Sequence, residues 1–274
     1  MSVALLERPD GGRVGWYATG SGTLPVLVLH ATLSSSLQLW RLASSLVEPR
    51  DCRAILVDRR GHGESRLAGP GPLDVATHVE DLVAVLDAAG IGETLVVGHS
   101  FGGVVALELA ARHPGRVGGV VVYEPPYAPV APEEAHPWFE ATRDRTIAAA
   151  REGGPAAAAE AFLRAVSGDA AWEALSERGR EFVAAQGAGA IADVALLGLD
   201  PAGLERIDAA VGLLVGGGSD PVYGAISDGL LERLRFPRQV TLPGLAHTAP
   251  ITEGATVAAA IRECLAAFGV LRPR

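Results

Sequence analysis

The chain has 274 residues, of which 49% are hydrophobic and 20% charged, and its net charge is −9 at pH 7. This length and apolar content predict one large domain, or one domain with a sizeable insertion. The acidic balance argues against nucleic-acid binding, and no run of basic residues offers a patch for anionic lipids.

Several further chemistries lack the residues they need. The sequence contains neither lysine nor asparagine, which excludes a Schiff-base lysine and a P-loop lysine. HExxH and CxxC patterns are also missing, so we expect no metal and no cofactor. The first residues lack a signal-peptide pattern, and no apolar stretch has membrane-spanning length. A cytoplasmic protein without membrane contact is therefore expected.

Apolar runs in chain order predict a sheet. Residues 3–20 form two short strand patterns around an Asp-Gly-Gly turn, as in a hairpin. Uniformly apolar, β-branched runs follow, and such runs are typical of strands buried on both faces of a parallel sheet. They lie at 24–30, 53–58, 94–98, 117–124, 211–217 and 239–244.

Helical periodicity appears between these strands, at 33–47, 74–90, 104–115 and 255–269. Asp74 is placed to cap the second of these helices, and Gly90 to end it. The alternation predicts a doubly wound, mostly parallel α/β sheet. Residues 126–207 break it with an Ala-rich helical stretch. We therefore expect a core of residues 1–125 and 208–274, with a helical cap of residues 126–207 inserted between two strands.

The stretch "LVVGHSFGGVV" places Ser100 between a strand pattern and a helix pattern. Gly98 and Gly102 complete a G-x-S-x-G pattern, which is weak alone but has the expected strand–turn–helix context. A sharp turn there would raise the Ser100 hydroxyl above the carboxyl edge of the sheet, as a nucleophile. The alternative is a serine that merely caps the helix in a glycine turn.

A serine nucleophile needs a base, and the base needs an acid. Among the seven histidines, His247 follows the last strand at the carboxyl edge, where it can face Ser100. Asp220 follows the preceding strand and would supply the acid, or else it is a turn-forming Asp before Pro221. The order Ser100, Asp220, His247 is the order of the α/β-hydrolase arrangement.

The chain resembles the α/β-hydrolase superfamily over nearly its full length. The resemblance is carried in order by "LVLHATLSSSLQLW", "LVDRRGHGES", "VVGHSFGGVVALELAARHPGRV", "VVVYEPP", "GGGSDP" and "PGLAHTAP". It implies a Ser-His-acid hydrolase with a helical cap between the sixth and seventh strands.

The resemblance also implies an oxyanion hole and a second candidate acid. One donor would be the backbone N–H of Phe101, and the other would come from the loop after the first parallel strand, where we expect the N–H of Thr32. Ala31 stands where the family usually has glycine. Glu124 ends the strand in "VVYEPP", and some related enzymes take their acid from that position. We favour Asp220 and keep Glu124 as the alternative.

These features favour a serine hydrolase acting on a carboxylic ester, lactone or thioester through an acyl-enzyme. The partner would be a small molecule with an apolar portion, because the cap is rich in apolar and aromatic residues. The same residues leave open a non-hydrolytic use of the fold, such as acyl transfer, a lyase or a cyclase, and a ligand-binding receptor. Oligomeric state stays open.

Overall fold

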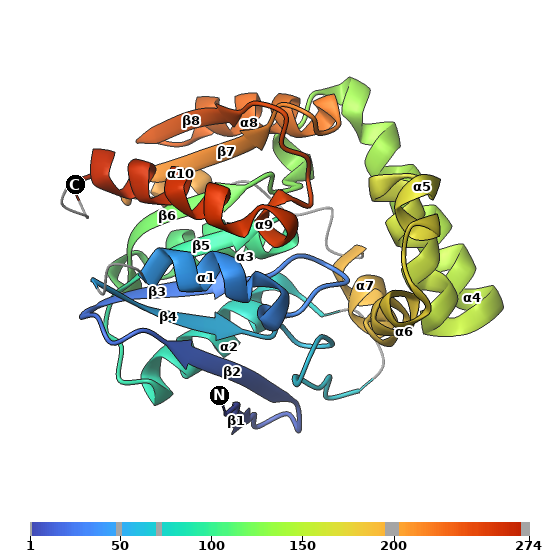
Figure 1. The fold of residues 1–274 in the computed structure, drawn as a ribbon, viewed down its shortest axis with the longest axis horizontal. Helices are drawn as coiled ribbons and strands as arrows, with labels where there is room; N and C mark the ends of the chain where they lie inside the picture. The colour runs from blue at the N-terminus through green and yellow to red at the C-terminus, as the bar shows by residue number, and fades with distance from the viewer. Residues whose placement is uncertain (1, 48–50, 70–72, 195–202, 270–274) are drawn as a thin grey trace.

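An eight-stranded sheet forms the centre of the protein in the computed structural model, which describes residues 2–47, 51–69, 73–194 and 203–269 (Figure 1). Its strand order is β1-β2-β4-β3-β5-β6-β7-β8. The bounds are β1 Ala4–Glu7, β2 Arg13–Thr19, β3 Leu24–Leu29, β4 Cys52–Val57, β5 Thr94–His99, β6 Val117–Tyr123, β7 Val211–Gly216 and β8 Pro237–Leu242. Every predicted strand is present, with ends shifted by two residues or fewer.

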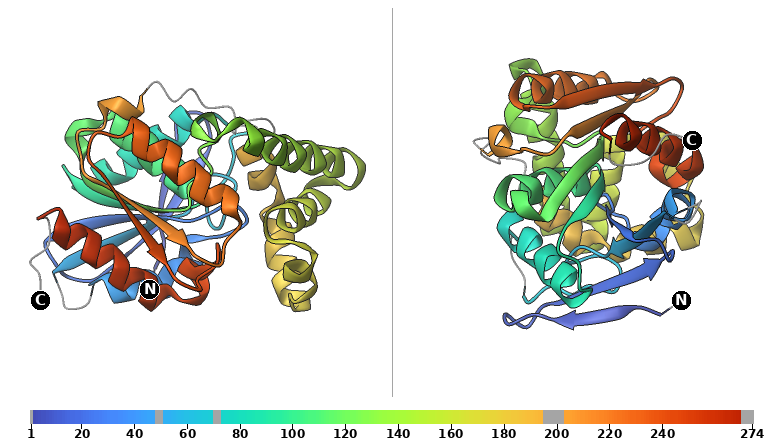
Figure 2. Two further views of the ribbon diagram at one scale, coloured as in Figure 1. Left: turned by 90° about the horizontal axis from the view of Figure 1, so that it is seen from above. Right: turned by 90° about the vertical axis from the view of Figure 1, so that its left-hand side faces the viewer.

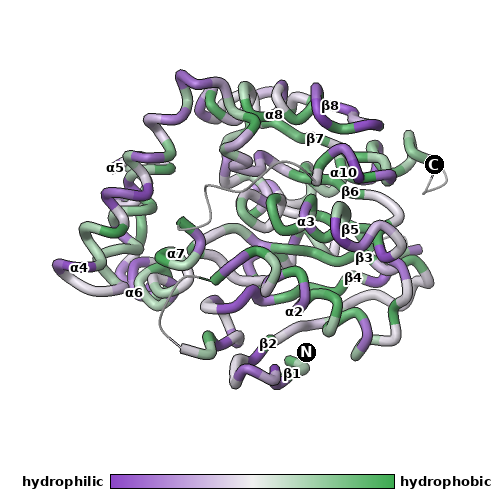
Figure 3. The backbone as a smooth tube through the Cα atoms, turned by 180° about the vertical axis from the view of Figure 1, so that it is seen from behind, coloured by the Kyte–Doolittle hydropathy of each residue, from purple (hydrophilic) through white to green (hydrophobic). Residues whose placement is uncertain are grey.

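Strand direction follows the predicted scheme. The first hairpin pairs β1 with β2 antiparallel, and β2 also pairs antiparallel with β4. The remaining neighbours, from β4 through β3, β5, β6 and β7 to β8, are all parallel. The central strands are mostly hydrophobic, as both of their faces are covered (Figure 3). The predicted mostly parallel α/β fold is confirmed.

Helices cover both faces of the sheet (Figures 1 and 2). One face packs against α1 (Trp40–Val47) and α10 (Gly254–Ala267), which follows the short α9 (Ala249–Thr252). The other packs against α2 (Val75–Ala88), α3 (Phe101–Arg112) and α8 (Pro221–Arg233). Asp74 caps α2 as predicted, because its carboxylate accepts the backbone N–H of Thr77. The sheet is thus packed between two helical layers.

Among the residues that the structure describes, four α-helices lie between β6 and β7 in the chain and stand beside the carboxyl edge of the sheet (Figures 1 and 2). These cap helices are α4 (His136–Ser167), α5 (Asp169–Glu173), α6 (Glu177–Ala185) and α7 (Gly187–Val194). Gly154 has φ 74° and is followed by Pro155, so α4 is kinked there. The described part of residues 126–207 contains no strand.

Two segments differ from the prediction. The helix expected from residue 33 begins as a 3-10 turn (Ser36–Leu39) that leads into α1, and Leu33 has a positive φ of 56°. Helix α8 was not predicted at all, although Asp220 and Pro221 are a typical N-cap and first-turn pair. Both differences lie at the carboxyl edge of the sheet.

Candidate functional site

Ser100 occupies a strained turn between β5 and α3. Its backbone angles are φ 53° and ψ −124°, a region that non-glycine residues rarely adopt. Its N–H donates to the carbonyl oxygen of Tyr123 at 2.8 Å, and its carbonyl accepts the N–H of Gly103 at 2.7 Å. These bonds hold the turn, so the serine side chain leaves the sheet at its carboxyl edge.

The glycines beside Ser100 are required by close backbone approach. A Cβ at Gly102 would lie 2.5 Å from the carbonyl oxygen of His30 on β3's side of the turn. A Cβ at Gly98 would lie 2.5 Å from the carbonyl oxygen of Gly102. The structure thus gives the G-x-S-x-G pattern the physical reason that the sequence suggested.

Backbone strain gathers around this serine. Among the described residues, three that are not glycine have positive φ: Leu33, Ser100 and Glu124. Each follows a parallel strand, β3, β5 or β6, at the carboxyl edge of the sheet. Strain of this kind persists where the surrounding structure fixes it, and it is concentrated at functional sites. Three adjacent strands therefore turn sharply at one place.

His247 lies in the loop after β8 and contacts Glu124. Its Nδ1 donates to Oε2 of Glu124 at 2.6 Å, and the Glu124 side chain is fully buried. The other carboxylate oxygen, Oε1, accepts the backbone N–H of Gly216 at 2.7 Å. With both oxygens engaged, the carboxylate fixes the ring and leaves Nε2 on the opposite edge.

Asp220 has a different task, which corrects the expectation that it supplies the acid for His247. It is the N-cap of α8, and its Oδ1 accepts the backbone N–H of Val222 at 2.9 Å. This is the turn-forming interpretation that the Asp-Pro sequence also allowed. The carboxylate that reaches the histidine comes from β6, as the alternative acid Glu124.

Two aromatic side chains fix His247, one through its ring and one through its backbone. The Tyr223 ring on α8 stacks on it, with centroids 4.3 Å apart and planes 8° from parallel. His99 donates from Nε2 to the backbone carbonyl of His247 at 2.8 Å. Burial lowers the pKa of His99 well below its usual value, so it is a neutral donor at neutral pH. The histidine loop is thus fixed by its neighbours as well as by Glu124.

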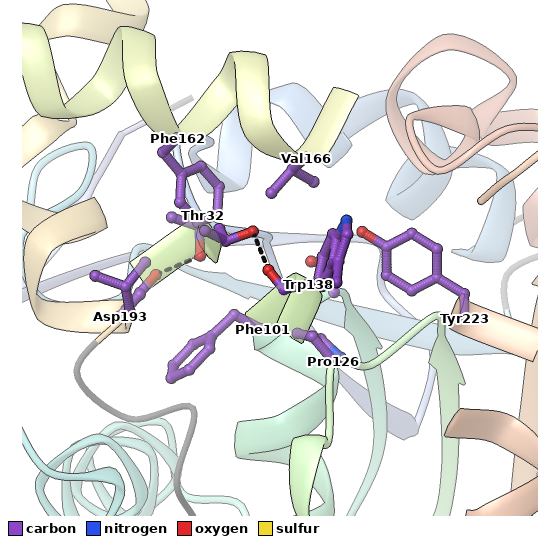
Figure 4. A pocket seen from close by; sticks show the side chains of 11 residues that line it. Thr32, Phe101, Pro126, Trp138, Phe162, Val166, Asp193 and Tyr223 are labelled. Carbon is purple, nitrogen blue, oxygen red and sulfur yellow. Dashed lines mark hydrogen bonds between the residues drawn. The ribbon is translucent and has the colours of Figure 1, made fainter. Parts of the chain in front are cut away.

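Phe101 and Thr32, the two residues predicted to supply oxyanion donors, both border a cavity beside Ser100. Phe101 is the first residue of α3, where backbone N–H groups have no partner within the helix. Phe101 is 2% exposed, and the Arg59 guanidinium lies over its ring, 4.9 Å from the centroid. Thr32 lines the pocket drawn in Figure 4, and it borders both of the cavities that Ser100 borders.

A buried carboxylate on α7, Asp193, reaches this loop from the cap, and sequence reasoning missed it. Thr32 Oγ1 donates to Asp193 Oδ2 at 2.6 Å (Figure 4). The guanidinium of Arg59 donates to both oxygens of Asp193, each at 2.9 Å. Burial would raise the pKa of Asp193, but Arg59 and the histidines nearby lower it below its usual value. This ion pair joins the cap to the core beside the Thr32 loop.

Two cavities meet at Ser100. One, of about 20 Å³, lies toward Phe101, Trp138 and Tyr223 and is called the small cavity here (Figure 4). The other, of about 260 Å³, includes His247 in its lining and is called the large cavity. Ser100, Thr32, Phe162 and Val166 border both cavities. Ser100 and His247 therefore face one common space, the large cavity.

Within the ranges that the structure describes, no three His, Cys, Asp or Glu side chains gather closely enough to hold a metal ion. No helix in the same ranges is both long and apolar enough to cross a bilayer.

Comparisons with known proteins agree with this architecture. The model of the alpha/beta hydrolase fold family matches residues 25–162. A similar curated protein is lipase LipV of Mycobacterium tuberculosis, 40% identical over 109 residues, which are 39% of this chain and 40% of the relative. The chain thus matches about two fifths of that relative's length.

Solved structures are similar over almost the whole chain. A hydrolase from Pseudomonas aeruginosa PA01 has a TM-score of 0.78 at 23% identity, covering 96% of this chain and 98% of that one. An alpha/beta hydrolase from Sphaerobacter thermophilus has a TM-score of 0.72 at 27% identity, covering 93% and 99%. The likeness extends beyond the residues of the family match and includes the cap helices.

Proposed function

Because the chain belongs to the alpha/beta hydrolase fold family, we propose that it is a serine hydrolase that cleaves a carboxylic ester, lactone or thioester. One observation carries the proposal. Ser100, on its strained turn, borders the same cavity as His247, whose Nδ1 is held by the buried carboxylate of Glu124. A nucleophile, a base and an orienting acid are thus combined at one edge of the sheet.

The first half of the reaction forms an acyl-enzyme. Ser100 Oγ bonds to the carbonyl carbon as its proton passes to His247 Nε2, and Glu124 stabilises the resulting imidazolium. The carbonyl oxygen becomes an oxyanion, which the N–H groups of Phe101 and Thr32 bind. Each such donor contributes about 3 kcal/mol to stabilising the transition state. The bond to the leaving oxygen or sulfur then breaks, and His247 returns the proton to that atom.

The second half releases the acid. Water gives a proton to His247 and attacks the acyl carbon, and the bond from that carbon to Ser100 Oγ breaks. The proton returns to Ser100, which restores the enzyme. The substrate would be a small molecule with an apolar portion, because leucine, valine and isoleucine side chains line much of the large cavity. We propose a cytoplasmic location.

The test is covalent labelling with a fluorophosphonate, followed by turnover of p-nitrophenyl acetate. We expect one label per chain on Ser100, seen by mass spectrometry, and loss of both label and turnover in Ser100→Ala. Ser44→Ala on α1 is the matched control and should keep both. Absence of label and turnover in the folded protein would contradict the proposal. It would favour a binding protein, or a cyclase, lyase or acyltransferase on the same fold.

A further inference from the structure

The two cavities beside Ser100 differ more than tenfold in volume. An ester has two parts, the acyl group and the alcohol, and each part needs a space beside the serine. The small cavity measures about 20 Å³ and the large one about 260 Å³. A space of 10–15 Å³ on this measure holds about one water molecule. The small cavity therefore has room for only a small group without rearrangement, whereas the large cavity admits a chain or a ring.

Rigid aromatic groups bound the small cavity. Trp138 packs edge to face against Phe139 at 5.0 Å and against Tyr223 at 6.0 Å between ring centroids. Figure 4 shows Trp138 and Tyr223 side by side on one flank, with Phe101 below and Phe162 above. Phe101 is held by Arg59, so this wall cannot turn aside easily. Enlarging the cavity would require several packed rings to move together.

The large cavity has a largely aliphatic apolar lining and is bordered by the base, His247. Its apolar walls come from the cap helices and from the loops after β3 and β8, and they include Leu33, Leu163, Leu175, Val183 and Ile251. His247 and Thr248 line the large cavity. Among the described residues that line the small cavity, neither of the two is present. The proton donor of the proposed reaction thus faces the large space.

Proton transfer determines which cavity receives the acyl group and which receives the leaving group. The leaving oxygen must accept its proton from His247 Nε2 as its bond to the carbonyl carbon breaks, so it lies on the histidine's side. The acyl group stays bonded to Ser100 Oγ and takes the remaining direction, away from His247. The large cavity therefore receives the leaving group, and the small cavity receives the acyl chain.

We infer that this chain prefers esters of a very short acyl group with a bulky, apolar alcohol. This inference rests on the proposed function and adds to it the direction in which the ester binds. Acetyl fits the small cavity, since one methyl group is about the size of a water molecule. Each methylene added to the acyl side would have to displace a ring of that wall, whereas methylenes on the alcohol side bury apolar surface in the large cavity.

Two isomeric esters test the direction of binding: hexyl acetate and ethyl hexanoate contain the same atoms. We expect kcat/KM for hexyl acetate to exceed that for ethyl hexanoate by roughly 10- to 100-fold, measured by titrating released acid at constant pH. The ratio of the two values is the readout, because it is independent of the fraction of active enzyme. p-Nitrophenyl acetate and the Ser100 label report separately whether the enzyme is a serine hydrolase.

Two variants should move this ratio by different routes. Trp138→Ala enlarges the small cavity and should lower the ratio about tenfold by admitting ethyl hexanoate. Ala171→Phe fills part of the large cavity and should lower the ratio by a similar factor through loss of hexyl acetate turnover. Leu5→Ser on β1, an exposed position far from Ser100, is the control and should leave the ratio unchanged.

The possible results separate this inference from the proposed function. A ratio near one, or a preference for ethyl hexanoate, with Ser100-dependent hydrolysis of both, would overturn the inference and leave the serine hydrolase standing. Hydrolysis of p-nitrophenyl acetate with no turnover of hexyl acetate would also overturn it. If Ser100 takes no label and no ester is cleaved, the proposed function fails and this inference fails with it.

Discussion

Two buried carboxylates lie near Ser100, one in the core and one in the cap, and they have different partners. Glu124 directly follows β6 and accepts from His247, whose side chain is 14% exposed and borders the large cavity. Asp193 lies on α7 and accepts from Arg59, whose side chain is 1% exposed, and from Thr32. Both carboxylates have their oxygens fully engaged, so burial and hydrogen bonding alone do not distinguish their tasks.

The difference lies in what each partner can do with a proton. Imidazole gains and loses a proton near neutral pH, so a carboxylate beside it can stabilise a charge that appears during a reaction. Guanidinium keeps its proton at every accessible pH, so the pair of Arg59 and Asp193 is a fixed contact. We therefore expect Glu124 to affect the rate of catalysis. We expect Asp193 to affect the free energy of unfolding and the position of the cap.

The largest effect should come from Glu124→Gln. The new amide oxygen can still accept the N–H of Gly216, which turns the NH₂ group toward His247 and forces Nδ1 to act as an acceptor. Nε2 then carries the proton and cannot take one from Ser100, so kcat should fall about 10³- to 10⁴-fold. Steady-state turnover of p-nitrophenyl acetate measures this loss.

Asp220→Asn is the matched control for this variant. Asparagine caps helices as well as aspartate does, so α8 should remain capped and kcat should stay within about twofold. A large loss in Asp220→Asn together with a small loss in Glu124→Gln would restore Asp220 as the catalytic acid. Near-equal activity of both variants and the wild type would remove any acid from the mechanism.

Asp193→Asn should act mainly on stability. The substitution keeps the shape of the side chain but leaves the buried Arg59 guanidinium without its carboxylate. Removal of one partner from a buried ion pair costs about 3–5 kcal/mol. Urea unfolding followed by circular dichroism measures the free energy of unfolding, and Thr32→Ser, which keeps the hydroxyl donor to Asp193, is the mild control.

Turnover by the folded fraction of Asp193→Asn decides whether the comparison holds. We expect a smaller loss of kcat than in Glu124→Gln, because the chemical groups at Ser100 are unchanged. A loss of 10³-fold or more in a fully folded protein would show that the two carboxylates do not have separate tasks, and that the contact with Thr32 is needed for catalysis itself.

The sequence predicted what depends on local patterns. Apolar runs indicated six of the eight strands, because a strand buried on both faces is apolar along its length, and the strand patterns around the Asp-Gly-Gly turn indicated the hairpin of β1 and β2. The glycines around Ser100 indicated its turn because close backbone approach excludes other residues there. His247 was selected because it follows a strand at the same edge, and the structure places it on the same cavity as Ser100.

Sequence could not decide what depends on the direction of a side chain. Glu124 and Asp220 both follow strands at the carboxyl edge, so topology alone allows either to reach His247. The positive φ of Glu124 is part of the local turn that the sequence does not display, while the Asp-Pro pair at 220 does carry a capping signal. Asp193 was missed because its partners lie 134 and 161 residues away, beyond any local pattern.

The smallest effect concerns two histidines that face Asp193 without binding it closely. His62 Nε2 lies 3.8 Å from Asp193 Oδ2, and His78 Nε2 lies 4.0 Å from Oδ1. Burial, followed by the charge of Arg59, lowers the pKa of His62 to about 4 and that of His78 to about 3. Arg59 already neutralises the carboxylate, so neither histidine is charged at pH 5.

Acidification should therefore destabilise the protein. Below pH 6.5 the unfolded chain binds protons on these histidines and the folded chain does not, so the free energy of unfolding falls as the pH drops toward 4. At pH 5 each histidine accounts for about 2 kcal/mol of that loss. In His78→Gln, the difference in unfolding free energy between pH 7 and pH 5, measured in urea, should shrink by about 2 kcal/mol. An unchanged difference would mean that His78 is protonated in the folded protein.

The variant Arg59→Met tests whether the charge of Arg59 is what distinguishes Asp193 from Glu124. Without the guanidinium, Asp193 would face His62 and His78 as Glu124 faces His247, with a carboxylate beside imidazole rings that can be charged. The pKa of both histidines should rise, because a cation is removed and the carboxylate becomes their counter-ion. The loss of stability between pH 7 and pH 5 should then be smaller than in the wild type. The permanent charge of Arg59, rather than the burial of the carboxylate, would thus be what prevents Asp193, His62 and His78 from exchanging protons.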